Sequence, residues 1–125
     1  SRKRYLLPSD DFMKELRILG GVSEAFFESP ELLEFFEPIL RSDFEVLEND
    51  DLKAEDFPKV NTPIHALMGS EERYTERIET WKEFTTSTAT CAVWPGNHFF
   101  IQQHAAKLTA FITEKANAQA LVQTA

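Results

Sequence analysis

Two short apolar runs, one on each side of a helical pattern, constrain the fold of this chain more than any other feature. Residues 63–68 form the first run, which ends at Gly69, and residues 90–94 form the second. Both runs have the length of strands, whereas residues 76–84 between them suit a helix. A strand, a helix and a second strand in this order form a unit with parallel strands. The sequence therefore predicts an α/β fold.

Two parallel strands make an incomplete sheet. Parallel sheets usually contain more strands and are covered on both faces, and an unpaired edge can pair with another chain. A final helix is expected from His98 or Phe99. Its expected buried side comprises Ile101, Ala105, Leu108, Phe111 and Ile112. This half resembles the end of a doubly wound sheet whose earlier strands would precede Ser1, so we expect the chain to be part of a longer protein.

The first half of the chain is predicted to be helical. A first helix is expected to begin at Ser9 or Asp10, either of which can cap it, and to end at Gly20. A second helix is expected after Ser29, an N-cap that is followed by a proline at the first helical position. Pro38 lies inside this helix and is expected to kink or break it, because proline lacks an N–H. The polar residues 48–58 are expected to form a loop.

The second helix carries a wide apolar stripe. Its members are Leu32, Leu33, Phe35, Phe36, Ile39, Leu40 and Phe44, while Glu31, Glu34 and Glu37 are expected to face away. An amphipathic helix that buries one face accounts for such a stripe. A second interpretation is that part of the phenylalanine surface lines a pocket for an acyl chain. The sequence leaves both interpretations open.

Composition and charge exclude several classes of function. The net charge is −8, and 15 of the 21 acidic residues precede Asn61, so the chain would repel a nucleic-acid backbone. The apolar runs are far shorter than the ~18 residues that a membrane-spanning helix needs, and no secretory signal opens the chain. A single cysteine agrees with a reducing, cytoplasmic compartment. We expect neither a nucleic-acid nor a membrane partner.

Polar side chains follow both predicted strands. His98 lies in a glycine-containing turn after the second strand, where open α/β sheets place ligands and catalytic groups, and an imidazole there can act as a general base. Glu71 and Glu72 follow the first strand, where a carboxylate can orient the imidazole. In α/β-hydrolases a serine, an acid and a histidine follow in that order. The alternatives are that His98 only caps a helix or bonds within its turn, and that the glutamates only favour a helix N-terminus.

Six ordered segments carry a more specific signal. They are residues 7–12, 16–21, 38–44, 69–72, Trp81 and residues 95–100. This pattern resembles type II thioesterases, the stand-alone α/β-hydrolases that accompany nonribosomal peptide and polyketide synthetases. The resemblance implies that residues 1–60 form a helical lid region with a connecting loop. It also implies that residues 61–125 are the C-terminal strand–helix–strand–helix part of the hydrolase core, with the N-terminal half of the fold absent.

The resemblance implies roles for individual residues. His98 matches the family's catalytic histidine in its Gly-x-His-Phe turn, and Glu72 matches the catalytic acid, which is usually Asp in the family. Glu71 is a weaker candidate for that acid. Arg41 and Asp43 match a lid motif for which we expect no catalytic role. The family acts on acyl groups held as thioesters on the phosphopantetheine arm of acyl or peptidyl carrier proteins, so we expect these partners and no cofactor in the chain itself.

The chain contains no Gly-x-Ser-x-Gly motif, so the family's nucleophile is missing from it. We expect the parent protein to be a serine-type thioesterase that edits stalled or misloaded synthetases or releases product, and we expect the chain alone to be inactive. Alternatives are a non-catalytic module that binds a carrier protein or acyl chain, and a small structural α/β domain. Cys91 is expected to be a small buried apolar residue, and His65 and His104 are expected to be structural or to face solvent. The spacing of the histidines suits no metal site.

Overall fold

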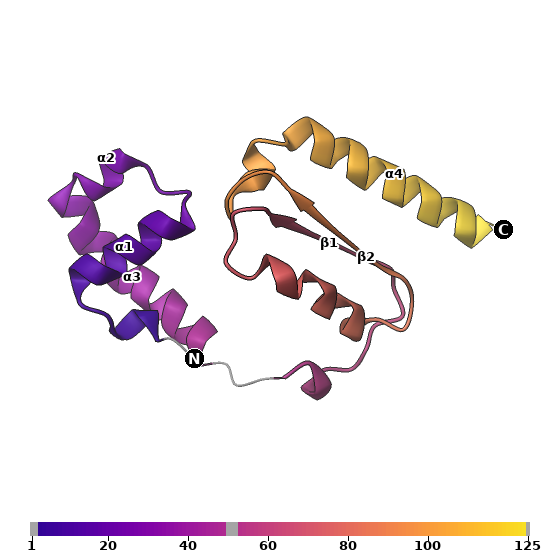
Figure 1. The fold of residues 1–125 in the computed structure, drawn as a ribbon, viewed down its shortest axis with the longest axis horizontal. Helices are drawn as coiled ribbons and strands as arrows, with labels where there is room; N and C mark the ends of the chain where they lie inside the picture. The colour runs from indigo at the N-terminus through magenta and orange to yellow at the C-terminus, as the bar shows by residue number, and fades with distance from the viewer. Residues whose placement is uncertain (1–2, 50–52, 125) are drawn as a thin grey trace.

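The computed structural model describes residues 3–49 and 53–124, which form two parts (Figure 1). The helical part consists of η1 (Arg4–Leu6), α1 (Ser9–Leu19), α2 (Glu24–Phe27) and α3 (Pro30–Glu48). The α/β part consists of η2 (Ala54–Asp56), β1 (Ile64–Gly69), η3 (Thr75–Phe84), β2 (Ala89–Trp94), η4 (Phe100–Gln102) and α4 (Ala105–Thr124). The order of helices followed by strand, helix and strand agrees with the sequence.

The first long helix, α1, ends where the sequence predicts but is capped differently. Gly20 follows the helix with a φ of 82°, in the left-handed region that glycine favours. Pro8 occupies the N-cap position, so the expectation that Ser9 or Asp10 caps the helix is wrong. The Ser9 hydroxyl instead donates to Glu37 Oε1 of α3 at 2.8 Å. A side chain that could have capped its own helix therefore joins two helices.

The longest helix of the helical part, α3, has the predicted cap but not the predicted break. The Ser29 hydroxyl accepts a backbone N–H three residues further on at 3.4 Å. The helix then continues through Pro38 for its whole length. Although Pro38 removes one backbone hydrogen bond, the ion pair between Glu37 and Arg41 spans it on the helix surface at 2.6 Å. The sequence had suggested that Glu37 faces away into solvent. In the structure it is instead paired with Arg41.

A small apolar core holds the helical part together. Phe12 and Leu16 of α1 and Phe44 of α3 are buried in it, and the rings of Phe12 and Phe44 meet edge to face with centroids 5.5 Å apart. Most of the apolar stripe of α3 lies outside this core. Its exposed members are Leu32, Phe35, Phe36 and Ile39. The helix therefore buries a narrower face than the stripe predicts.

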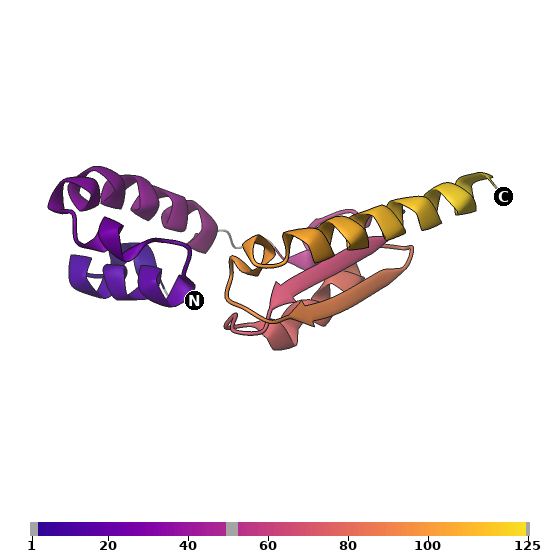
Figure 2. The ribbon, with the colours of Figure 1, turned by 90° about the horizontal axis from the view of Figure 1, so that it is seen from above.

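The two strands of the α/β part pair in parallel along their whole length, as predicted, with Gly69 opposite Trp94 at their carboxyl ends. Figures 1 and 2 show η3 on one face of this sheet and α4 on the other. On the η3 face, Ala66 and Ile78 are buried. On the α4 face, the Trp94 ring meets Phe111 edge on, with centroids 5.8 Å apart. Both faces of the sheet are thus covered, at least in part.

Two helical segments of this part differ from the predictions. The segment between the strands, predicted to be a helix, consists of 3₁₀ turns, and its Trp81 is 50% exposed. The final helix does not begin at His98 or Phe99, which form a turn before η4 and α4. Ile101 and Ile112 of its expected buried side are 47% and 57% exposed. The chain must first turn back over the end of the sheet, so the regular helix begins later.

The connection between the two parts begins one residue later than predicted and contains a short 3₁₀ helix. The polar segment 48–58 was expected to be a loop, but α3 extends to Glu48 and η2 occupies part of the remainder. Residues 50–52 of that segment lie outside the described residues.

Among the described residues, no helix combines the length and the apolar character that a membrane crossing requires.

Candidate active site

Two loops leave the same edge of the sheet, one after each strand. The Ser70 N–H donates to the Trp94 carbonyl at 2.8 Å, and the next N–H donates to the Gly96 carbonyl at 2.9 Å. These bonds continue the pairing of the strands into the loops. Gly69 permits the close approach, because a Cβ at this position would lie 2.2 Å from the Asn97 carbonyl oxygen. The two loops are therefore packed backbone against backbone.

The side chains of Glu72 and His98 meet across these loops. His98 Nδ1 lies 2.8 Å from Glu72 Oε2, and the other carboxylate oxygen accepts the Gly69 N–H at 2.8 Å. An ionised Glu72 accepts the Nδ1–H of a neutral imidazole, which leaves the lone pair of the ring on Nε2. The Glu72 side chain is 16% exposed and that of His98 is 51% exposed. The acid is thus shielded, while the imidazole is open to a ligand.

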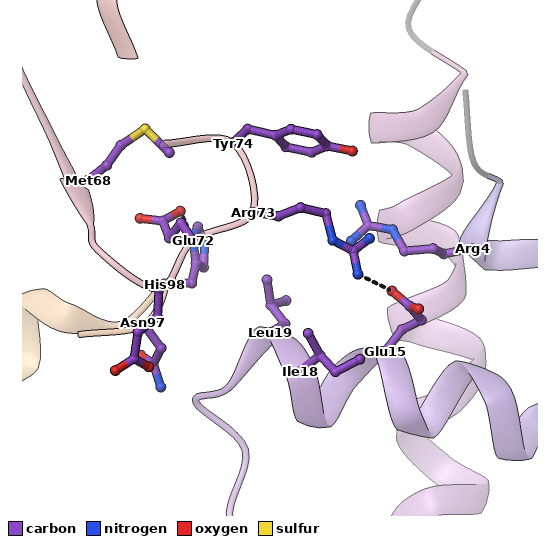
Figure 3. Close-up of a pocket in the computed structure, with 11 residues that line it drawn as sticks. Arg4, Glu15, Ile18, Leu19, Met68, Glu72, Arg73, Tyr74, Asn97 and His98 are labelled. Atoms are coloured by element: carbon purple, nitrogen blue, oxygen red, sulfur yellow. Dashed lines mark hydrogen bonds and ion pairs between the residues drawn. The ribbon is translucent and has the colours of Figure 1, made fainter. Parts of the chain in front are cut away.

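A pocket of about 240 Å³ opens beside this pair, between the helical part and the α/β part (Figure 3). Ile18 and Leu19 from α1 give the pocket an apolar side, and Met68 from β1 lies across from them, on the side of the α/β part (Figure 3). Glu72 and His98 lie at its other side. The remaining lining residues are Arg4, Glu15, Glu71, Arg73, Tyr74 and Asn97. An apolar wall beside an imidazole can hold an acyl group next to a general base.

Other residues that the sequence singles out lie apart from the bond between the acid and the imidazole. Glu71 lines the pocket, but its side chain is exposed and the carboxylate that contacts the imidazole is that of the following residue. His65 Nδ1 lies 2.6 Å from Thr90 Oγ1, and His104 Nε2 lies 2.7 Å from a backbone carbonyl oxygen. Cys91 Sγ donates to a carbonyl of η3 at 3.4 Å. In residues 3–49 and 53–124, no three metal-binding side chains form a cluster.

An ion pair that the sequence analysis did not predict joins the two parts. Glu15 Oε2 of α1 lies 3.6 Å from Arg73 Nη2, in the loop after β1 (Figure 3). The Glu15 residue is only 7% exposed. The sequence indicates the unusual position of Glu15, although not its partner. Glu15 lies three residues after Phe12 and next to Leu16, so it belongs to the apolar face of its helix. A charged residue on such a face needs a partner.

The parallel strands, with an acid after one strand and a histidine after the next, have the arrangement found in α/β-hydrolases. Comparison with known proteins places the chain more narrowly. The model of the thioesterase domain matches residues 1–116. The chain belongs to this thioesterase family.

Relatives of the chain come from peptide and polyketide biosynthesis. The gramicidin S biosynthesis protein GrsT of Aneurinibacillus migulanus is 28% identical over 113 residues, which are 89% of this chain and 43% of GrsT. The structure of YbtT, the type II thioesterase of the yersiniabactin NRPS/PKS pathway, is 28% identical with a TM-score of 0.76, over 91% of this chain and 47% of YbtT. Both matches lie in the C-terminal portion of the relative.

A third comparison concerns the fold alone. The crystal structure of ClbQ from the colibactin NRPS/PKS pathway has a TM-score of 0.82 at 24% identity, over 98% of this chain and 52% of ClbQ. The chain therefore has the fold of the C-terminal portion of an α/β-hydrolase, and it spans about half the length of the relatives that it matches.

Proposed function

We propose that this chain supplies the histidine and the acid of a serine thioesterase. The proposed substrates are acyl groups on the phosphopantetheine arm of carrier proteins that serve nonribosomal peptide or polyketide synthetases. The observation that carries the proposal is the 2.8 Å contact between His98 Nδ1 and Glu72 Oε2 at the ends of neighbouring parallel strands. Membership of the thioesterase family supports the reaction, and the pathways named for GrsT and YbtT support the class of substrate.

The proposed reaction needs a serine from the portion of the relatives that this chain does not span. His98 Nε2 takes the serine proton while the serine oxygen attacks the thioester carbonyl. The tetrahedral intermediate then loses the thiolate, which receives the proton from the imidazolium, and an acyl-enzyme remains. Water attacks this ester by the same route and gives the free carboxylic acid and the serine. Removal of a misloaded group and release of a product both consist of this hydrolysis.

Glu72 holds the imidazole during these steps. Its carboxylate fixes the tautomer that has the free lone pair on Nε2, and it stabilises the positive charge that the ring acquires. The glutamate is one methylene longer than the aspartate usual in the family. Here the bond from the Gly69 N–H to Oε1 fixes the longer side chain, while Oε2 reaches His98. Within the described residues His98 Nε2 makes no hydrogen bond, so it is available to the serine.

A hybrid protein tests the proposal. The N-terminal half of YbtT, whose C-terminal portion aligns with this chain, is joined to the present chain, and hydrolysis of an acyl-loaded carrier protein is measured. We expect the hybrid to hydrolyse the thioester and the chain alone to be inactive. His98→Ala and Glu72→Gln should each reduce kcat by at least about 100-fold, because both remove the oriented general base.

Glu76→Gln provides the matched control. It makes the same chemical change four residues away, on an exposed side chain that does not line the pocket. We expect kcat of this variant to stay within about twofold of the unsubstituted hybrid, since surface substitutions away from the reacting groups have small effects. An active hybrid that keeps full activity with both His98→Ala and Glu72→Gln would show that the assignment is wrong.

A further inference from the structure

In the described residues, the helical part and the α/β part pack more extensively within themselves than against each other. The element pairs with broad contacts, such as α2 with α3 and each strand with η3, all lie within one part. The C-terminal end of α1 touches the His98 turn, where Gly20 lies against the Asn97 side chain and Gly21 against the Phe99 ring. The ion pair between Glu15 and Arg73 is another contact between the two parts.

These contacts lie next to the residues of the proposed reaction. Asn97 and Phe99 are the chain neighbours of His98, and Arg73 is the chain neighbour of Glu72. One helix, α1, therefore touches the histidine loop with its C-terminal end and the acid loop with a side chain from its middle. Figure 3 shows the Arg73 side chain extending from the acid loop to Glu15 on α1.

Because Glu15 is buried, its negative charge affects the stability of the fold. Its side chain is 7% exposed and shares a helix face with Phe12 and Leu16, the core of the helical part. An ionised carboxylate in such surroundings destabilises the fold unless a positive charge lies close to it. Arg73 places a positive charge beside Glu15 from the other part of the molecule, at 3.6 Å, a distance typical of an ion pair rather than of a short hydrogen bond. The ion pair with Arg73 therefore favours the arrangement in which α1 lies against the acid loop.

The position of α1 decides whether the pocket is closed. Ile18 and Leu19 lie within one turn of Glu15 on the same helix and form the apolar side of the pocket, opposite His98. If α1 moves away from the acid loop, this apolar side moves with it. An acyl chain beside His98 would then lose the surface against which it packs.

We propose that Arg73 is a positioning residue that holds α1 over the pocket through its ion pair with Glu15. The inference rests on the proposed function, because it assigns to the pocket the acyl group of the thioester. Arg73 does not touch the reacting atoms. Its effect is on the fraction of molecules in which the apolar side of the pocket stands opposite His98 and Glu72.

A distance measurement tests this positioning directly, without any reaction. Nitroxide labels are attached to cysteines at Asp10 on α1 and Glu76 on η3, two exposed positions, in a Cys91→Ala background of the hybrid protein. Double electron–electron resonance then gives the distribution of distances between the two parts. We expect one narrow distribution for the parent hybrid.

A graded series at Arg73 separates charge from packing. Arg73→Lys keeps the positive charge, Arg73→Gln removes it and Arg73→Glu places a second negative charge beside Glu15. We expect the lysine variant to keep the narrow distribution, the glutamine variant to broaden it and the glutamate variant to broaden it most. Lys82→Gln is the control, since Lys82 is an exposed lysine whose ion pair with Glu79 stays within η3.

Kinetics of the same hybrid give a second readout. Loss of one ion pair of this kind should raise KM about fivefold in Arg73→Gln and leave kcat within about twofold, because the pocket opens while the reacting groups stay in place. A distance distribution unchanged in Arg73→Glu, or broadened equally by Lys82→Gln, would overturn the inference. So would a collapse of kcat with an unchanged KM. A hybrid without any hydrolysis would contradict the proposed function, whereas the distances would still decide the role of Arg73.

Discussion

At the scale of single residues, Gly69 determines how closely the acid loop and the histidine loop approach. A Cβ at Gly69 would lie 2.2 Å from the Asn97 carbonyl oxygen and 2.5 Å from that of Gly96. Both atoms belong to the backbone, so they cannot rotate out of the way as the end of a flexible side chain can. The N–H of Gly69 also binds Glu72. The absence of a side chain at this position is thus a condition for the contact between Glu72 and His98.

The first prediction follows from this contact. Gly69→Ala should push the two loops apart by several tenths of an ångström or more and lengthen the bond between Glu72 and His98. We expect thioester hydrolysis by the hybrid to fall by about 100-fold, the order of loss that a misplacement of about 1 Å causes. Ser70→Ala is the control, because it removes only the 3.2 Å bond from the Gly96 N–H to the Ser70 hydroxyl. Full activity of Gly69→Ala would mean that the loops tolerate separation.

At the scale of elements, Arg41 on α3 joins three segments of the helical part. Its guanidinium binds Glu37 on its own helix and donates to the carbonyls of Tyr5 and Leu7, at 2.8 and 2.7 Å. The same group lies over the Phe12 ring, 4.4 Å from its centroid. A planar guanidinium can make all these contacts at once and an ammonium cannot. A structural role of this kind is consistent with the expectation that Arg41 has no part in catalysis.

The second prediction concerns the pH dependence of this group of contacts. The hydrogen bond from Arg41 lowers the pKa of Glu37 below its usual value of 4.5, burial opposes the shift and the Ser9 hydroxyl adds to it. Because the pKa is lower in the folded state, the ionised carboxylate stabilises the fold above about pH 4.5, and this stabilisation is lost as the pH falls below that value. Glu37→Gln should therefore cost about 1 kcal/mol near neutral pH and less in acid.

Urea unfolding of the chain between pH 3 and pH 7, followed by circular dichroism, measures this difference. Glu34→Gln is the control, since Glu34 is exposed on the same helix. A difference between Glu37→Gln and the parent chain that stays constant with pH would contradict the prediction.

The helices and strands also show which features of the fold follow from the local sequence. Both strands were predicted to within one residue, because short apolar runs that end at turn residues leave few alternatives. The end of α1 was predicted from Gly20, whose backbone conformation is local. The predictions were wrong where contacts with residues far away in the chain determine the local structure. Ser9 binds Glu37 instead of capping its helix, and α3 passes through Pro38 where contacts across helices support it.

Part of the candidate site could also be predicted from the sequence. Parallel strands bring their carboxyl ends to one edge, so the loops that carry Glu72 and His98 could be expected to meet. The choice between Glu71 and Glu72 could not be made from the residues alone, because it depends on which side chain the turn after Gly69 aims at the imidazole. The Glu15–Arg73 ion pair connects residues that lie far apart in the chain, and no periodicity or motif pairs them.

At the scale of the whole molecule, the chain leaves much apolar surface uncovered. The sheet has two strands in the described residues, so each strand has one neighbour. A groove of about 490 Å³ lies between β1 and α4, lined by apolar residues that include Leu67, Leu108 and Phe111. Farther along α4, Leu121 and Val122 are each 71% exposed. Surfaces of this kind bind other apolar groups when nothing covers them.

The last prediction is that the chain alone binds the dye anilinonaphthalene sulfonate and self-associates, and that the hybrid with the N-terminal half of YbtT does so far less. The added half of the fold should cover the edge of β1 and the groove, which removes the sites for the dye. Fluorescence titration and analytical ultracentrifugation at several concentrations measure the two effects. Ile112→Gln in the chain alone is the control, since it should reduce dye binding at the groove without any partner. Equal dye binding by the chain and the hybrid would show that the groove stays open.

The register of the two strands has a consequence for how such a protein can change length. Each strand has six residues, and the ends that carry the acid loop and the histidine loop lie directly opposite each other. Inserting or deleting one residue in either strand would displace one loop against the other by about 3.3 Å and turn the following side chains to the opposite face. Glu72 and His98 would then no longer meet. An insertion or deletion within either strand is therefore incompatible with the contact on which the proposed reaction depends.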